Sequence, residues 1–212
     1  MLKKLERSNG TLDIVYKNNK LKKIYQSGCS KVLIPNSYNE NNELVFINTA
    51  GGVTCDDTIK VKLNLVDSNI SLSTQAAEKI YAGIGNEATI DIDISVKNSN
   101  LYWLPKELIL FNRSKLNRRI NLHLDTSSNA VFCETSIFGR KAMSEKIQNL
   151  SYSDIWKIFI NSKMKHCESI NMSNNILNNL NNKFTLNNNA AISTILVFGP
   201  LVECIKNDLN KI

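Results

Sequence analysis

The chain has few of the residues that usually build a catalytic centre or a metal site. Only two histidines, His123 and His166, occur among 212 residues, and neither adjoins a serine or cysteine in a recognisable catalytic signature. The cysteines are odd in number and widely spaced without a C-x-x-C pair, which argues against a disulfide framework and a zinc module. We therefore expect no catalytic residue, and reduced thiols at Cys29, Cys55, Cys133, Cys167 and Cys204.

Long apolar runs are also missing. No segment approaches the roughly 18 to 20 apolar residues that a membrane-spanning helix needs. The opening residues Met1 to Arg7 lead into polar residues and not into the apolar core of a signal peptide. This predicts a cytoplasmic protein without a membrane partner.

Acidic residues are outnumbered, which gives a formal net charge of +7 and a pI near 9.1. Such an excess suits nucleic acid, an anionic surface or an acidic partner protein. The lysines and arginines are spread along the chain, however, and the one compact basic run, Arg113 to Arg119, lacks interleaved aromatic residues. This pattern argues against nucleic acid and leaves an acidic partner protein open.

Alternating apolar and polar residues dominate the first two thirds of the chain. Residues 58–66, 89–96 and 120–125 each place aliphatic side chains on one face, which indicates half-buried antiparallel strands. Shorter apolar segments predict further strands at 12–16, 44–48, 70–73, 101–104, 108–111, 130–133, 155–160 and 191–198. The resulting fold class is mainly β, with stacked antiparallel or β-helix-like sheets in a single domain spanning 1–212. No repeat of fixed period is visible.

Helical patterns are scarce and late in the chain. Short helices are expected at 140–149 and at 173–184, and a terminal helix at 201–212 after the Gly199-Pro200 break. The asparagine-rich stretch at 171–189 is the segment that we expect to be most mobile. Elsewhere asparagine occurs mostly where turns are expected.

The densest polar segment runs from Asn48 to Asp57 and contains the pair Gly51-Gly52. A glycine pair after a strand indicates a backbone turn or a close approach of another segment. No Lys-Ser or Lys-Thr pair and no helix follow, which excludes a phosphate-binding loop. In an extended backbone Cys55 and Asp57 share a face, but two ligands make a weak metal site.

Two later segments carry candidate inward acids. In Thr74 to Tyr81, Glu78 is either half of a solvated charge couple with Lys79 or a carboxylate that lines a polar passage. In Leu101 to Phe111, Trp103 and Pro105 indicate core packing at a sheet corner. Glu107 shares their face and is either a turn carboxylate or a second inward acid.

The histidines suit surface positions better than a metal site. His123 stands on the polar side of an alternating strand and is expected to be exposed. His166-Cys167-Glu168 is the one place where three ligand-type residues adjoin. In a strand only His166 and Glu168 face the same way, so a metal site there would be incomplete.

Taken together, several segments resemble the urease accessory protein D family, UreD, also called UreH. Any one segment is a weak signal, but the ordered set is specific. In family order they are residues 26–31, 44–57 with Asn48 to Gly52, 73–81 with Gln75, 103–111 with Trp103 and Pro105, 138–145 with Gly139 and Arg140, and 154–158. The resemblance covers residues 20 to 165, with a fainter match at 192–200.

The resemblance implies a mostly β fold and a non-catalytic role in urease maturation. A protein of this family binds a UreF-type accessory protein, which recruits a UreG-type GTPase. The assembly docks on apo-urease and nickel passes to its active site, so nickel is in transit and no cofactor is tightly bound. By position, the acids of a polar nickel path are Asp57, Glu78, Glu107 and Glu134, which should lie beside water, Lys79, Arg140 or the metal.

Two departures from the family pattern stand out. Cys55-Asp56 replaces the glycines that usually precede the aspartate at Asp57, and the C-terminus is shorter than usual for the family. The rival functions are a basic β-fold binding module and a hydrolase that uses a pair of acids such as Asp57 and Glu78. A pocket with paired perturbed carboxylates would favour the hydrolase.

Overall fold

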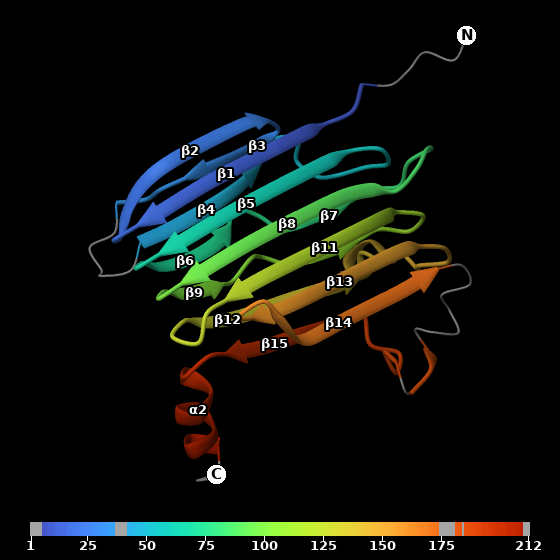
Figure 1. Ribbon diagram of the computed structural model, residues 1–212. Coiled ribbons are helices and arrows are strands. Elements are labelled where there is room, and N and C mark those ends of the chain that lie inside the picture. The colour runs from blue at the N-terminus through green and yellow to red at the C-terminus, as the bar shows by residue number, and fades with distance from the viewer. Residues whose placement is uncertain (1–5, 37–41, 174–180, 184, 210–212) are drawn as a thin grey trace.

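The alternation of apolar and polar residues gives each long strand one buried face, and two sheets bury these faces against each other (Figure 1). The computed structural model describes residues 6–36, 42–173, 181–183 and 185–209. Over these residues the chain is mainly β, as the sequence predicts.

The first sheet holds seven strands in the order β14-β13-β11-β8-β5-β1-β2. Their bounds are β1 (Asn9–Lys17), β2 (Lys20–Gly28), β5 (Thr58–Val66), β8 (Ala88–Lys97), β11 (Lys115–Leu124), β13 (Ser151–Ile160) and β14 (Lys163–Ser173).

The second sheet has the order β3-β4-β6-β9-β12-β10-β7, and β15 also pairs with β12. Its strands are β3 (Ser30–Leu33), β4 (Asn42–Asn48), β6 (Asn69–Thr74), β7 (Glu78–Ile80), β9 (Asn100–Trp103), β10 (Leu108–Leu110), β12 (Asn129–Phe138) and β15 (Ala191–Phe198). A 3₁₀ turn, η1 (Lys141–Met143), and the helix α2 (Leu201–Leu209) complete the described elements.

From β5 to β13 the chain winds alternately through the two sheets, as in a β-helix. Each strand of the first sheet is followed by one or two strands of the second, so consecutive strands of one sheet run in the same direction. The pairs β5–β8, β8–β11 and β11–β13 are therefore parallel, and the expectation of antiparallel pairing for these strands was wrong. Antiparallel pairing occurs at the edges, where β2 follows β1 and β14 follows β13 directly.

The coils differ in length, which explains why the sequence shows no fixed period. Strands of the first sheet begin at residues 58, 88, 115 and 151. At the corners between the sheets, asparagine and serine recur at equivalent positions of successive coils, although the number of residues per coil varies. Asn100 donates to Asn69 at 2.6 Å, and Asn129 donates to Asn100 at 2.8 Å. The backbone N–H of Ser68 likewise donates to Ser99 Oγ at 3.0 Å, and the N–H of Ser99 donates to Ser128 Oγ at 3.2 Å. Asn69, Asn100 and Asn129 therefore have a structural role at coil corners.

The helix predictions had mixed outcomes. Residues 140–149 do not form a helix beyond the three residues of η1, because Ser144 has a φ of +54° and Asn112 Oδ1 accepts the backbone N–H groups of Gln148 and Asn149. The predicted helix at 173–184 lies largely outside the described residues, the asparagine-rich stretch at 171–189 lies partly outside them, and Ser173 ends β14. The terminal helix is confirmed from Leu201 to Leu209.

Among the described residues, no helix has both the length and the apolarity that a membrane span requires. All five cysteines are free thiols, and Cys29 and Cys55 are buried. The core lies between the sheets and includes Leu63 of β5, Ile94 of β8 and Leu122 of β11.

Candidate functional site

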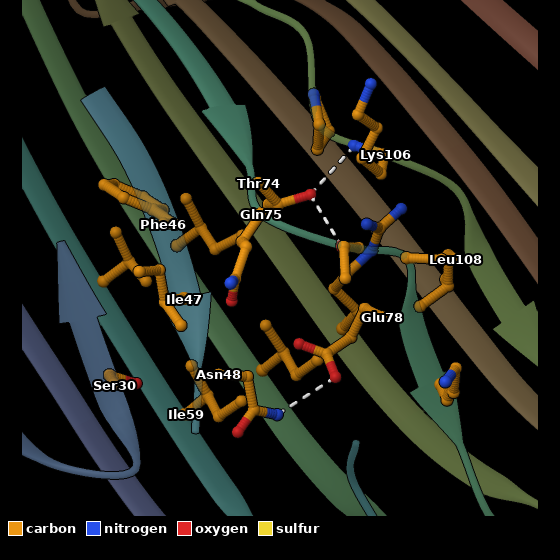
Figure 2. Close-up of a pocket in the computed structure, with 18 of the residues that line it drawn as sticks. Ser30, Phe46, Ile47, Asn48, Ile59, Thr74, Gln75, Glu78, Lys106 and Leu108 are labelled. Carbon is orange, nitrogen blue, oxygen red and sulfur yellow. Dashed lines mark hydrogen bonds between the residues drawn. The ribbon is translucent and has the colours of Figure 1, made fainter. Parts of the chain in front are cut away.

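A cavity of about 250 Å³ lies between the two sheets. Its walls are mostly apolar side chains, such as Ile59 and Val61 from β5 and Phe46 from β4. Polar groups enter from the second sheet and from one arginine, Arg118, of the first. Figure 2 shows Glu78 and Asn48 pointing toward each other in this space.

The cavity lies where the second sheet is interrupted. β12 runs unbroken, but its neighbour on one side is β9 at residues 129–132 and β10 at residues 136–138. Two short segments in adjacent coils belong to no strand. They are residues 104–107, between β9 and β10, and residues 75–77, between β6 and β7. Thr74 Oγ1 joins the two gaps, because it donates to the carbonyl of Ala76 and accepts the N–H of Lys106 at 2.9 Å (Figure 2).

Glu78 lines the cavity from the start of β7. Asn48 Nδ2 donates a hydrogen bond to its Oε1 at 3.0 Å. Burial raises the pKa of Glu78 to about 7, and the hydrogen bonds from Asn48 and the Lys79 backbone offset that rise only in part. A carboxylate that exchanges its proton near neutral pH can also exchange it for a cation.

Glu134 lines the same cavity from the middle of β12, opposite the interruption. Its side chain is 5% exposed. Trp103 Nε1 donates to Oε1 at 2.5 Å, and Arg118 Nη2 forms an ion pair with Oε2 at 2.7 Å. The cation beside Glu134 is Arg118, which was not among the neighbours expected for the path acids, namely water, Lys79, Arg140 or the metal.

Arg118 is held by a second carboxylate, Asp154 of β13, which lies directly beside it in the first sheet. Arg118 Nε and Nη2 donate to the two Asp154 oxygens at 2.9 and 2.6 Å. Tyr152 and Trp156 donate to Asp154 as well, at 2.8 and 3.0 Å. The two carboxylates raise the pKa of Arg118 and keep it charged, although burial acts in the opposite direction.

A second, smaller cavity of about 10 Å³, room for about one water, lies on the other side of this network. Its lining includes Asp154, Glu168 of β14 and Thr194 of β15, and again Arg118 and Glu134. The ion-pair network therefore separates a large internal cavity from a small one nearer the β14 and β15 edge.

The other predicted acids lie elsewhere. Asp57 is buried, but its Oδ1 and Oδ2 accept the backbone N–H groups of Ser8 and Thr54 at 2.7 and 2.8 Å, and it is outside the lining of both cavities. Glu107 is exposed, and its backbone carbonyl accepts the N–H of Glu78. The structure thus brings Glu78 and Glu134 to one cavity and does not bring Asp57 or Glu107 there. It does not supply the Asp57–Glu78 acid pair that the hydrolase reading needs.

The motif residues support this arrangement. Asn48 also donates to the carbonyl of Gly52, and Gly51 and Gly52 form the expected turn, with φ values of +74° and +154°. Gln75 and Lys79 line the large cavity. Trp103 is buried as predicted, and Pro105 follows it at the cavity wall.

At the end of β12, Gly139 makes a turn with a φ of +79°. Arg140 pairs with Glu145 at 3.0 Å and lies over the ring of Phe111. These residues shape the end of the second sheet.

Sequence reasoning missed Arg118 and Asp154 as site residues, although both carry a readable signal. Each is a charged residue in the apolar register of its strand, Arg118 between Leu116 and Ile120, and Asp154 between Tyr152 and Trp156. A charge in that register has to be buried, and a buried charge needs a partner.

The histidines behave largely as expected. His123 is exposed and stacks on Phe159 with ring centroids 4.8 Å apart. His166 Nε2 lies 3.6 Å from Glu168 on partly exposed β14. No group of three or more ligand-type side chains that could hold a metal ion occurs within the described ranges.

Comparison with known proteins identifies the family of the chain. Residues 8–211 match the family described as UreD urease accessory protein. The chain is 32% identical over 206 residues to the urease accessory protein UreD of Agrobacterium fabrum (strain C58 / ATCC 33970), a match that covers 94% of this chain and 72% of that protein. It is 33% identical over 186 residues to the urease accessory protein UreD of Rhizobium leguminosarum bv. viciae, covering 87% of this chain and 68% of the relative.

Proposed function

The chain belongs to the UreD urease accessory protein family, and on that premise we propose that it is a non-catalytic scaffold for nickel delivery to urease. In this role it bridges apo-urease to UreF-type and UreG-type partners in the cytoplasm. Nickel is cargo that passes through the protein and is not a resident cofactor. GTP hydrolysis belongs to the UreG-type partner, in keeping with the absence of a phosphate-loop motif from the sequence.

The observation that carries the proposal is the cavity between the sheets with Glu78 and Glu134 in its lining. Its walls are largely apolar, and besides these carboxylates the lining offers a divalent cation the side-chain oxygens of Ser30, Asn48, Thr74 and Gln75, together with water. Weak, successive coordination allows a cation both to enter and to leave, whereas a complete ligand set would retain it. Glu78 and Glu134 are therefore the acids we place on the nickel path. Asp57 and Glu107 are weaker candidates because of their positions.

The test compares acid-to-amide variants in cells that contain the urease subunits and the other accessory proteins. We expect Glu78→Gln and Glu134→Gln to lower nickel content and urease activity roughly tenfold, because an amide is a poorer cation ligand of nearly the same shape. Asp93→Asn is the matched control, since Asp93 is exposed on the outer face of β8.

Soluble amounts of this chain and its co-purification with the UreF-type protein must be equal for all three variants. Normal urease activity with both cavity variants would contradict the nickel path. Loss of solubility in the cavity variants would instead indicate that these acids have structural roles.

A further inference from the structure

Arg118 and Glu134 are the only residues that line both cavities in the described part of the chain. Their ion pair of 2.7 Å therefore forms the partition between the two spaces. A cation that reaches Glu134 from the large cavity meets a carboxylate that is already bound to a guanidinium group.

The two carboxylates hold Arg118 unequally. Asp154 accepts two guanidinium N–H groups and two further donors, the Tyr152 hydroxyl and the Trp156 indole. Glu134 receives one guanidinium nitrogen and the Trp103 indole. A bidentate pair of hydrogen bonds between a guanidinium group and a carboxylate is stronger and more directional than a single hydrogen bond. Glu134 is therefore the partner from which Arg118 separates more easily.

Charge balance favours the same separation. The network holds one cation and two carboxylates, all at most 8% exposed. A divalent cation at Glu134 would neutralise that carboxylate in place of Arg118. Arg118 would have to remain on Asp154, because leaving it would expose an uncompensated buried carboxylate.

We propose that Arg118 is a positioning residue that shares Glu134 with the transported cation. In the resting protein, Arg118 bridges Glu134 and Asp154 and closes the partition. A divalent cation replaces it on Glu134, Arg118 stays on Asp154, and the two cavities become connected. This inference rests on the proposed nickel path and adds a step of ligand exchange to it.

The two tryptophans of the chain give a direct readout, because each indole N–H marks one carboxylate. Trp103 donates to Glu134 and Trp156 donates to Asp154. Zn²⁺ serves as the probe because it is a diamagnetic divalent ion. In the full-length ¹⁵N-labelled protein, titration with Zn²⁺ should shift the Trp103 indole resonance, while the Trp156 resonance moves by less than roughly a fifth as much.

Two outcomes would overturn the exchange. If neither indole moves, no cation reaches Glu134. If both move equally, Arg118 leaves Asp154 as well and the network does not separate as proposed. Glu134→Gln is the control, and it should abolish the Trp103 response while both indole resonances remain dispersed, as in a folded protein.

A second variant probes the arginine itself. In Arg118→Lys the single ammonium group cannot form two parallel hydrogen bonds with Asp154 and also contact Glu134. The Zn²⁺ concentration that half-shifts Trp103 should therefore fall roughly threefold to tenfold. An unchanged midpoint would overturn the competition between Arg118 and the cation.

The same variants separate this inference from the proposed function. If Zn²⁺ does not shift the Trp103 indole resonance but Glu78→Gln impairs urease activation, the exchange is overturned and the nickel path is still supported. A responsive Trp103 together with normal activation in Glu78→Gln and Glu134→Gln would support the exchange and overturn the role in nickel delivery.

Discussion

At the residue scale, similar acids have different environments. Asp57 has both oxygens engaged by backbone N–H groups, and Glu134 has an arginine partner. Glu78 has only hydrogen bonds to set against its burial, so its pKa rises to about 7. A side-chain carboxyl group thus serves as a loop anchor at Asp57, as half of a buried ion pair at Glu134 and as a group that titrates near neutral pH at Glu78.

The raised pKa of Glu78 predicts a pH-dependent stability. Because the folded-state pKa of about 7 lies above the ordinary value of 4.5, the folded state binds more protons between these values. Stability should therefore fall as pH rises from about 5 to 8. Glu78→Gln cannot ionise and should become more stable than the parent protein at pH 8 by about 1 to 3 kcal/mol, and nearly equal at pH 5. Urea unfolding at both pH values measures the difference. Parallel pH profiles for the two proteins would contradict the prediction.

At the element scale, the cavity depends on elements that stop early. β6 ends at Thr74 and β9 at Trp103, and the chain resumes pairing only at Glu78 and Leu108. The turn at Gly51-Gly52 lies against this region, because an added Cβ at Gly52 would meet the Tyr81 ring and the Lys79 carbonyl. At Gly51 an added Cβ would meet nothing within 4 Å.

Adding one methyl group at each of these two glycines should lower the stability of the protein by unequal amounts. Gly51→Ala should cost about 1 kcal/mol, since its only penalty is the positive φ. Gly52→Ala should cost about 3 kcal/mol, because it also forces Tyr81 and the β7 backbone to move. Thermal and urea unfolding of the two variants checks the order. Equal losses would show that the contact with Tyr81 and Lys79 has little energetic importance.

At the scale of the whole molecule, successive coils share one core between two sheets. Parallel neighbours such as β5 and β8 pair residues about 30 positions apart, and within the first sheet only β1–β2 and β13–β14 are local pairs. Arg118, Asp154 and Glu134 join both sheets at one point. The two sheets should therefore lose their structure together.

This arrangement predicts a single cooperative unfolding transition. Tryptophan fluorescence reports the network between the sheets, because Trp103 and Trp156 both donate into it, and far-ultraviolet circular dichroism reports the strands themselves. Urea unfolding curves from the two signals should have midpoints that agree within error. Loss of the fluorescence signal at clearly lower urea would mean that the sheets separate before the strands unfold.

The sequence alone determined many of the strands and the buried face of those that alternate, because alternation is a local property that holds for either pairing direction. It did not predict β2, β3, β7 or β14. The aromatic and proline residues of 101–111 predicted Trp103 in the core, whereas Glu134 was named only through the family resemblance. The sequence could not show that β5, β8 and β11 pair in parallel, since pairing direction depends on the path of the connections. Only the tertiary structure decided which charges meet. Arg118 has Asp154 beside it in one sheet and Glu134 across the core, and these contacts join strands that are far apart in the chain.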